Sequence, residues 1–359
     1  MSTRTRSLTL ATVGVGLALA LSGCSGGGET SPSGAAAAED FTLCMGVGGK
    51  DAGSMAQGDA AEALAEKNGW KYYELNNNSD GPTANTNVDL FIQHGCSTVM
   101  EFNYAGTQEV IQQKLETAGI PGITFDLPQK GMYLVAVDNE GAGKDTGVAL
   151  GEEAKSMWDC DADLVLLGEQ ANAGPVNDLR VGGSEDGLLS VCPNIDKSKI
   201  VNFEGGNTVD TATTAARDAL VSRPEAEKIL TLGIGDNTVF AVLQAADQLG
   251  RGANTFGWGQ GAYLLSGDST PAGLLGDSVY FFEDYPIAAV DQLVKKIAAG
   301  DAPAMADTLE DAAVSISACL TDRQQTLDMP AIDIRLKQLI ADGLSSNAYD
   351  TFCPSASNG

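Results

Sequence analysis

The eight residues GIPGITFD, at positions 119–126, contain the pattern on which the fold depends. An amphipathic helix precedes them, with Ile111 and Leu115 on one face. The run GITF is short and β-rich, and Asp126 stands directly after it. The pattern predicts a helix, then a buried strand, then a carboxylate at the C-terminal end of that strand.

The same strand-helix unit recurs through most of the chain. The predicted strands are residues 42–47, 71–75, 98–102, 122–125, 133–137, 163–167, 199–203, 228–234, 255–258 and 278–282. Several are apolar throughout, which is typical of parallel strands covered on both faces. Strands that alternate with helices at a spacing of roughly thirty residues predict βαβ units with parallel sheets. Ten strands fit two sheets better than one, so we predict an α/β protein with two domains.

Polar and aromatic residues follow the predicted strands, at the end where open parallel sheets bind their ligands. The candidates for ligand binding are Asp51, Asn103, Tyr104, Asp126, Asp236, Trp258, Gln260 and Phe282, with Phe281 as an alternative to Phe282. Carboxylates and amides bind hydroxyl groups, and aromatic faces cover C–H surface, so a sugar or polyol is the predicted ligand. Asn and Asp are also common at turns and helix N-caps, which leaves a structural alternative at each of these positions.

The N-terminus has the pattern of a bacterial lipoprotein signal. Arg4 and Arg6 precede an apolar run over residues 8–21, and Ser22, Gly23 and Cys24 follow this run directly. We predict that residues 1–23 are a signal peptide and that Cys24 carries lipid. Residues 24–40 are rich in Gly, Ser and Ala and predict a flexible tether. The predicted location is extracytoplasmic, anchored to the cell membrane and facing a periplasm or the cell surface.

Composition excludes several classes of function. The net charge of −27 argues against nucleic acid as a partner, because phosphate binding needs a basic surface. His94 is the sole histidine and no CxxC spacing occurs, so no metal site and no cofactor are predicted. The sequence contains no recognisable pairing of a nucleophile with a general base, which argues against an enzyme. The six cysteines after Cys24 predict disulfides, and their number alone allows 15 pairings.

From Phe41 to about Asp301 the chain resembles periplasmic solute-binding proteins of the ribose-binding type. The shared motifs are EFN at 101–103, GIPGITFD at 119–126, VDN at 137–139 and GDN at 235–237. The resemblance implies the type I fold, in which two doubly wound parallel-sheet domains are joined by a multi-strand hinge. It also implies that the domains close over a sugar and that the bound protein docks on an ABC permease.

The resemblance implies domain boundaries and residue roles. Residues 41–137 plus 283–318 would form the N-terminal binding domain, 138–282 the C-terminal one, and 319–359 an extension that shorter members lack. Asp126 and Asn103 would contact sugar hydroxyls from one domain, and Arg180 would donate from the other. The chain departs from the family at Gly53, which stands where aromatic residues are usual, and at Gly259, which stands at a position usually polar.

The topology that the resemblance implies also suggests disulfide pairings. Cys160 and Cys192 would precede neighbouring strands of the second domain, and Cys44 and Cys96 would have the same relation in the first. Cys319 and Cys353 then remain for the extension.

We therefore predict a monomeric, lipid-anchored solute-binding protein that captures a sugar or polyol and delivers it to an ABC permease. Two alternatives stay open: a receptor of the same fold that presents its ligand to a membrane sensor, and an exported enzyme.

Overall fold

A computed structural model describes residues 40–102, 107–206, 208–261, 270–305, 314–316, 318–328 and 332–344. The predicted signal peptide, Cys24, Asn103, Tyr104 and Cys353 lie outside these residues. The described residues form two six-stranded sheets, and we call each sheet with its covering helices a lobe. The predicted fold class, two parallel α/β domains of the type I fold, is confirmed.

The first lobe is built on the strand order β11-β5-β4-β3-β1-β2, with all neighbours parallel. Its elements are β1 (Thr42–Val47), α1 (Ala52–Asn68), β2 (Lys71–Asn76), α2 (Gly81–His94), β3 (Thr98–Glu101), α3 (Gln108–Ala118), β4 (Gly122–Phe125), β5 (Tyr133–Val137), α8 (Asp284–Ala289), a π-helical turn (Val290–Val294), α9 (Lys295–Ala298) and β11 (Val314–Ile316). One face of this sheet packs against α2 and α3, and the other packs against α1 and α8. Strands β1, β3, β4 and β5 are buried on both faces, as their apolar composition predicts, whereas the edge strand β2 is only partly buried.

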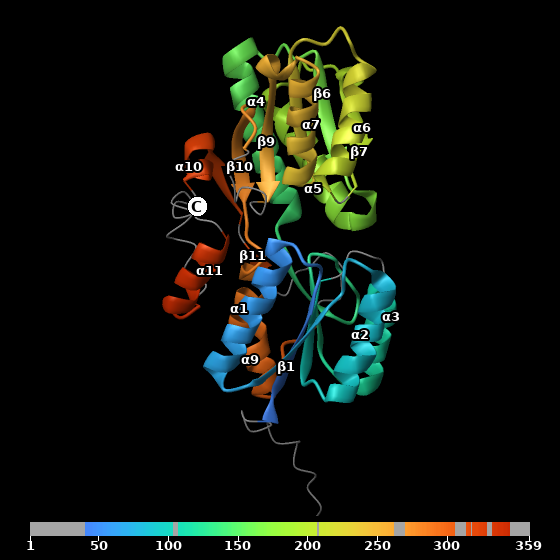
Figure 1. The fold of residues 1–359 in the computed structure, drawn as a ribbon, viewed down its shortest axis with the longest axis vertical. Helices are drawn as coiled ribbons and strands as arrows, with labels where there is room; N and C mark the ends of the chain where they lie inside the picture. The colour runs from blue at the N-terminus through green and yellow to red at the C-terminus, as the bar shows by residue number, and fades with distance from the viewer. Residues whose placement is uncertain are drawn as a thin grey trace, which may run out of the picture. The chain divides into compact units, whose positions relative to one another are not determined.

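The second lobe has the strand order β12-β10-β9-β8-β6-β7, in which β12 is antiparallel to β10 and the other neighbours are parallel. Its elements are α4 (Asn139–Trp158), β6 (Leu164–Glu169), α5 (Pro175–Val191), β7 (Ile200–Glu204), α6 (Val209–Val221), β8 (Ile229–Gly233), α7 (Asp236–Gln248), β9 (Thr255–Gly261), β10 (Leu274–Val279), β12 (Cys319–Asp322) and α10 (Arg323–Leu327). Helices α4 and α5 cover one face and α6 and α7 the other (Figure 1).

Glycines let α4 and α5 approach each other closely. A Cβ atom at Gly143 would lie 2.3 Å from the carbonyl oxygen of Arg180, and one at Gly147 would lie 2.1 Å from that of Ser184. Both distances are shorter than any real contact of a Cβ atom. Side chains at these positions would push α5 away from α4, so the glycines set the position of Arg180.

The structure has strands at all ten predicted positions, with one clear shift. Strand β10 ends at Val279 rather than at Phe282, because residues 280–283 leave the second sheet and lead to α8 in the first lobe. Strands β11 and β12 were not predicted. They are three and four residues long and are defined by pairing with β5 and β10.

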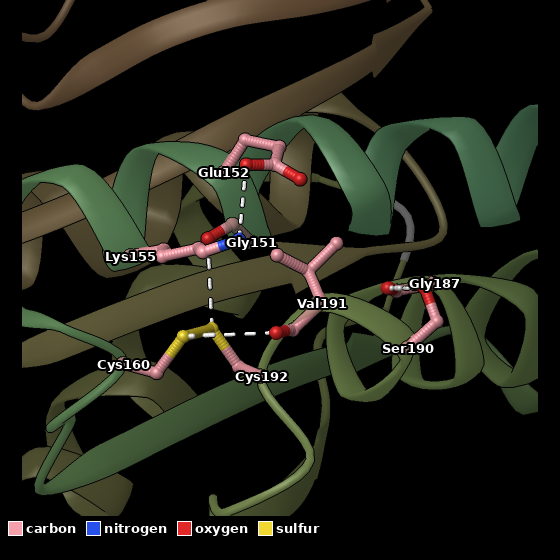
Figure 2. Close-up of a disulfide and its surroundings, with 8 residues drawn as sticks. All are labelled: Gly151, Glu152, Lys155, Cys160, Gly187, Ser190, Val191 and Cys192. Carbon is pink, nitrogen blue, oxygen red and sulfur yellow. Dashed lines mark hydrogen bonds and ion pairs between the residues drawn. A yellow bond between two sulfur atoms is a disulfide. The ribbon is translucent and has the colours of Figure 1, made fainter.

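Two disulfides occur at the predicted pairs, one in each lobe. Cys44 on β1 is bonded to Cys96 before β3, and Cys160 is bonded to Cys192. Figure 2 shows the second bond between α4 and the end of α5, where the Cys192 sulfur lies 3.5 Å from the carbonyl oxygen of Gly151. Cys319 is also disulfide-bonded, and its predicted partner Cys353 lies outside the described residues.

The C-terminal part of the chain contributes to both lobes. β12 extends the second sheet, whereas α11 (Ile332–Ala341) packs against α1 of the first lobe. The first-lobe core includes Ile332, Leu336 and Leu339 of this helix. The predicted boundaries of the domains and of the extension stay predictions. In the described part of the chain, no helix has the length and apolar character needed to span a membrane.

Candidate functional site

The candidate site is a cavity of about 60 Å³ lined by residues of both lobes. It is larger than the roughly 10–15 Å³ that one ordered water needs. The lining residues are Phe102, Asp126, Leu127, Gln170, Ala173, Val176, Arg180, Ile234, Gly235, Asn237, Tyr280 and Phe282. Most of them follow the C-terminal ends of strands, where open α/β sheets bind their ligands.

Asp126 enters the cavity from the first lobe, directly after β4. Its backbone is in the left-handed region, with φ 57°, which Asp tolerates better than most residues. One carboxylate oxygen accepts a hydrogen bond from the backbone N–H of Val137 at 3.3 Å. The other lies 2.9 Å from Nη2 of Arg180. The carboxylate is therefore held in one orientation from two sides.

Arg180 enters from the second lobe, on α5, and is fixed by four groups. Besides Asp126, its Nε donates to the side chain of Asn139 at 2.6 Å and its Nη1 to the carbonyl oxygen of Ile234 at 3.4 Å. Its guanidinium carbon lies 4.8 Å from the ring centre of Tyr280. Burial lowers the pKa of Arg180, but the effects of Tyr280 and Asp126, which raise it, are together larger. The net shift of the pKa is therefore upward, and the group stays charged.

Phe282 and Phe102 form an aromatic wall, with ring centres 5.5 Å apart. A Cβ atom at Gly53 on α1 would lie 2.7 Å from the ring of Phe282. Gly53 therefore leaves room for the Phe282 ring. Of the residues predicted to bind ligand, the structure brings Asp126, Arg180 and Phe282 together at the cavity.

Four other candidates are not among the residues that line the cavity. Asp51 is exposed and caps α1, where its carboxylate accepts from the backbone N–H of Ser54 at 2.9 Å. Trp258 is in the core of the second lobe. Asp236 accepts from the backbone N–H of Gln260 at 2.8 Å, and both are fully buried. The ligand-binding roles of these residues stay predictions, as do those of Asn103 and Tyr104.

Gln170, Asn237 and Tyr280 also line the cavity but were not among the residues predicted to bind ligand, although Asn237 belongs to the GDN motif. Gln170 and Asn237 both donate to the carbonyl oxygen of Gly206, at 2.8 and 3.2 Å. Each follows a predicted strand, so the rule that located Asp126 could have found them. Tyr280 had no such signal, because the predicted strand ran past it.

Each lobe buries carboxyl groups at or near the ends of its strands. Glu101 directly precedes Phe102, and burial raises its pKa to about 8. Asp277 on β10 lies beside Asp236, and burial together with the charge of Asp236 raises the pKa of Asp277. A Cβ atom at Gly259 would lie within 2.9 Å of both of these carboxyl groups, so no larger side chain fits there. Among the described residues, no three Cys, His, Asp or Glu side chains are grouped to hold a metal ion.

A family model described as a periplasmic binding protein domain matches residues 45–274. The chain belongs to this family. Its members bind solutes and are not enzymes. No curated protein matches the sequence at a significant level.

Solved structures of periplasmic binding proteins share the fold at low sequence identity. One is an ABC transporter solute-binding protein of Actinobacillus succinogenes with bound D-allose, at 15% identity and a TM-score of 0.65, covering 81% of this chain and 100% of that one. Another is the Caulobacter myo-inositol-binding protein with myo-inositol, at 18% identity and 0.64, covering 85% and 100%. A third, from Mycobacterium smegmatis with bound glycerol, has 18% identity and 0.62, covering 80% and 96%.

Proposed function

We propose that this periplasmic binding protein captures a neutral sugar or polyol between its lobes and delivers it to an ABC permease. The pairing of Asp126 with Arg180 is the observation that carries the proposal. Of the described residues that line the cavity, these two are charged, and their charges compensate each other. A neutral ligand can accept from the guanidinium and donate to the carboxylate, whereas a charged ligand would leave a buried charge unpaired.

The aromatic wall supports the same ligand class. Phe102, Phe282 and Tyr280 offer apolar surface beside the amides of Gln170 and Asn237. A molecule with hydroxyl groups and C–H faces satisfies both kinds of surface. The solved relatives named above contain D-allose, myo-inositol and glycerol, which belong to this class.

Binding would act through lobe closure. Asp126 and Arg180 belong to different lobes, so a ligand that contacts both favours the state in which the lobes are close. The equilibrium shifts by the ligand's differential affinity for the two states. No covalent step is required.

A thermal-shift screen of the protein tests the proposal. The panel contains D-allose, myo-inositol, glycerol, other pentoses and hexoses, and nucleosides and amino acids as contrasting classes. A ligand with micromolar Kd at millimolar concentration stabilises the protein by about 4 kcal/mol. A clear response to a nucleoside or an amino acid, without one to any sugar or polyol, would overturn the ligand class.

We propose further that the protein is exported and anchored by lipid on Cys24. The signal-like residues 1–23 and the Gly- and Ser-rich residues that follow support this. A coil of that length spans tens of Å, enough for the lobes to reorient beside a permease. Metabolic labelling with an alkyne fatty acid should tag the wild-type protein and not the Cys24→Ala variant. Equal labelling of both would refute the anchor.

A further inference from the structure

The C-terminal segment joins the two lobes a second time through contacts that the binding site does not use. β12 pairs with β10 of the second sheet, and α11 packs into the core of the first lobe. The end of α11 is held as well, because the Lys67 ammonium on α1 donates to the carbonyl oxygen of Gly343. The segment is therefore attached to both lobes.

Arg335 is the polar side chain that α11 buries against the residues connecting β10 to α8. It is fully buried, and its guanidinium donates to Glu283 and, through one nitrogen, to both oxygens of Asp284 at 3.0 Å. The guanidinium carbon also lies 3.6 Å from the ring centre of Phe281. Burying an arginine is energetically costly unless carboxylates and hydrogen bonds compensate its charge.

The partners of Arg335 lie in the crossing segment, residues 280–284, that leads from the second lobe to the first. β10 ends at Val279 and α8 begins at Asp284. Two residues of the same segment, Tyr280 and Phe282, line the cavity. Residues that contact Arg335 therefore alternate along the chain with residues that face the cavity.

We propose that Arg335 is a positioning residue for ligand binding: from the C-terminal helix it fixes the crossing segment, and so sets how far the lobes separate without ligand and where Tyr280 and Phe282 stand. The proposal rests on the proposed function for the meaning of lobe closure. The ligand-free protein then occupies a restricted range of open states, so it loses less conformational entropy when the lobes close on a ligand.

A simpler explanation is that Arg335 merely attaches the C-terminus to the surface of the first lobe. The two explanations differ in what happens to the crossing segment when the contacts of Arg335 break. Simple attachment predicts that α11 opens while the crossing segment keeps its order. Positioning predicts that both lose order together.

Native-state hydrogen exchange of the ligand-free wild-type protein provides the first test. The amides of Asp284 and Tyr285 donate to the carbonyl oxygens of Phe281 and Phe282 and report on the crossing segment. We expect these amides and those of α11 to exchange through one shared opening as urea is raised. Exchange of α11 through a separate, lower-energy opening that leaves the two reporters protected would overturn the proposal.

Variants provide the second test. Arg335→Met alone leaves two buried carboxylates without a cation and can fail to fold. The triple variant Glu283→Gln, Asp284→Asn, Arg335→Met removes all three charges together. The matched control is Lys337→Met, which removes an exposed ion pair with Asp333 from the same helix.

The readout is the distribution of distances between the lobes, measured without ligand on dyes attached to non-natural residues at the exposed positions Gln93 and Glu225. We expect the triple variant to show a broader distribution than the wild-type protein and the control, and its two reporter amides to exchange about tenfold faster or more. Unchanged distributions and exchange in the folded triple variant would refute positioning. If no sugar or polyol binds, the proposed function fails while these ligand-free measurements still decide the role of Arg335.

Discussion

Glu101 offers a sharp test of the structure, because its side chain is buried with little to stabilise a negative charge. It is 2% exposed and, among the described residues, its carboxyl group accepts one hydrogen bond, from the amide of Asn77 at 2.8 Å. A Cβ atom at Gly46 would lie 2.5 Å from either carboxyl oxygen, so the neighbouring strand closes over the group. We predict that Glu101→Gln, which imitates the protonated side chain, stabilises the protein at neutral pH.

The magnitude follows from the pKa. Burial raises the pKa of Glu101 from 4.5 to about 8 in the folded state, although the hydrogen bond from Asn77 opposes the shift. Between these values the folded protein holds a proton that the unfolded chain releases, so the wild-type protein loses stability as pH rises. The loss is about 1.36 kcal/mol per pH unit, or about 2 kcal/mol at pH 6, 3 at pH 7 and 4 at pH 8. The Gln variant keeps this free energy.

Urea denaturation of both proteins from pH 5 to pH 9 measures the difference in the free energy of unfolding. The advantage of Glu101→Gln should grow with pH and level off above pH 8. Glu66→Gln is the control, since Glu66 is exposed on α1 and its variant should differ little from wild type at any pH. An advantage for Glu101→Gln that is absent or constant across this range would show that Glu101 is not a buried acid.

Three further changes test the fold and the site. Replacing Cys160 and Cys192 together by Ala should lower the free energy of unfolding, measured in urea, by about 3–4 kcal/mol, because the bond closes a loop of 32 residues. Gly143→Ala should cost about 1–3 kcal/mol and weaken binding of the sugar found by screening, because its Cβ would meet the backbone of Arg180. Asp126→Ala should weaken the same binding, measured by calorimetry, by more than about tenfold, since a hydrogen bond to a charged group is worth about 1.5–3 kcal/mol.

Two control variants keep these predictions separable. Gly182→Ala places a methyl group on α5 where no described atom outside the adjoining helix backbone lies within 4 Å, so it should stabilise the protein by up to about 1 kcal/mol. The same result for Gly143→Ala would contradict the close approach of α4 and α5. Asp51→Ala should cost about 1 kcal/mol as a lost N-cap. A large loss of affinity in that variant would instead assign Asp51 to ligand binding, and unchanged affinity in Asp126→Ala would remove Asp126 from the site.

Strand positions were predictable because burial on both faces leaves a readable mark in the sequence. The run LVLL of β6 and the run ILTL of β8 are almost wholly apolar and buried, and both are shorter than an ordinary helix. β11 and β12 carry no such mark, since three or four residues are too few for a period and pairing alone makes them strands. The end of β10 was misplaced because the run at 280–282 is aromatic for another reason: its residues line the cavity or lie against Arg335.

The lining of the candidate cavity was predictable to the level of strand ends and no further. The rule that ligands bind beyond strand ends does not say which of two consecutive residues faces the cavity. Asp236 was chosen over Asn237, but Asp236 opens α7 with its carboxylate on the backbone of Gln260, and Asn237 lines the cavity. Arg180 lies far from Asp126 in sequence, and the resemblance, rather than any local pattern, identified it.

Asp126 combines an unfavourable backbone conformation with a buried ion pair, and such conflicts between local and tertiary preferences cluster at functional positions. A left-handed backbone at a residue other than Gly costs about 1–2 kcal/mol, and glycine would remove that cost. Glycine would also leave Arg180 without the carboxylate that lies 2.9 Å from it, in a place where burial disfavours an unpaired cation. The strained backbone of Asp126 is therefore offset by the ion pair that its carboxylate forms with Arg180 of the other lobe. The packing of β4 alone does not require that arrangement, whereas the proposed binding of a ligand by both lobes would account for it.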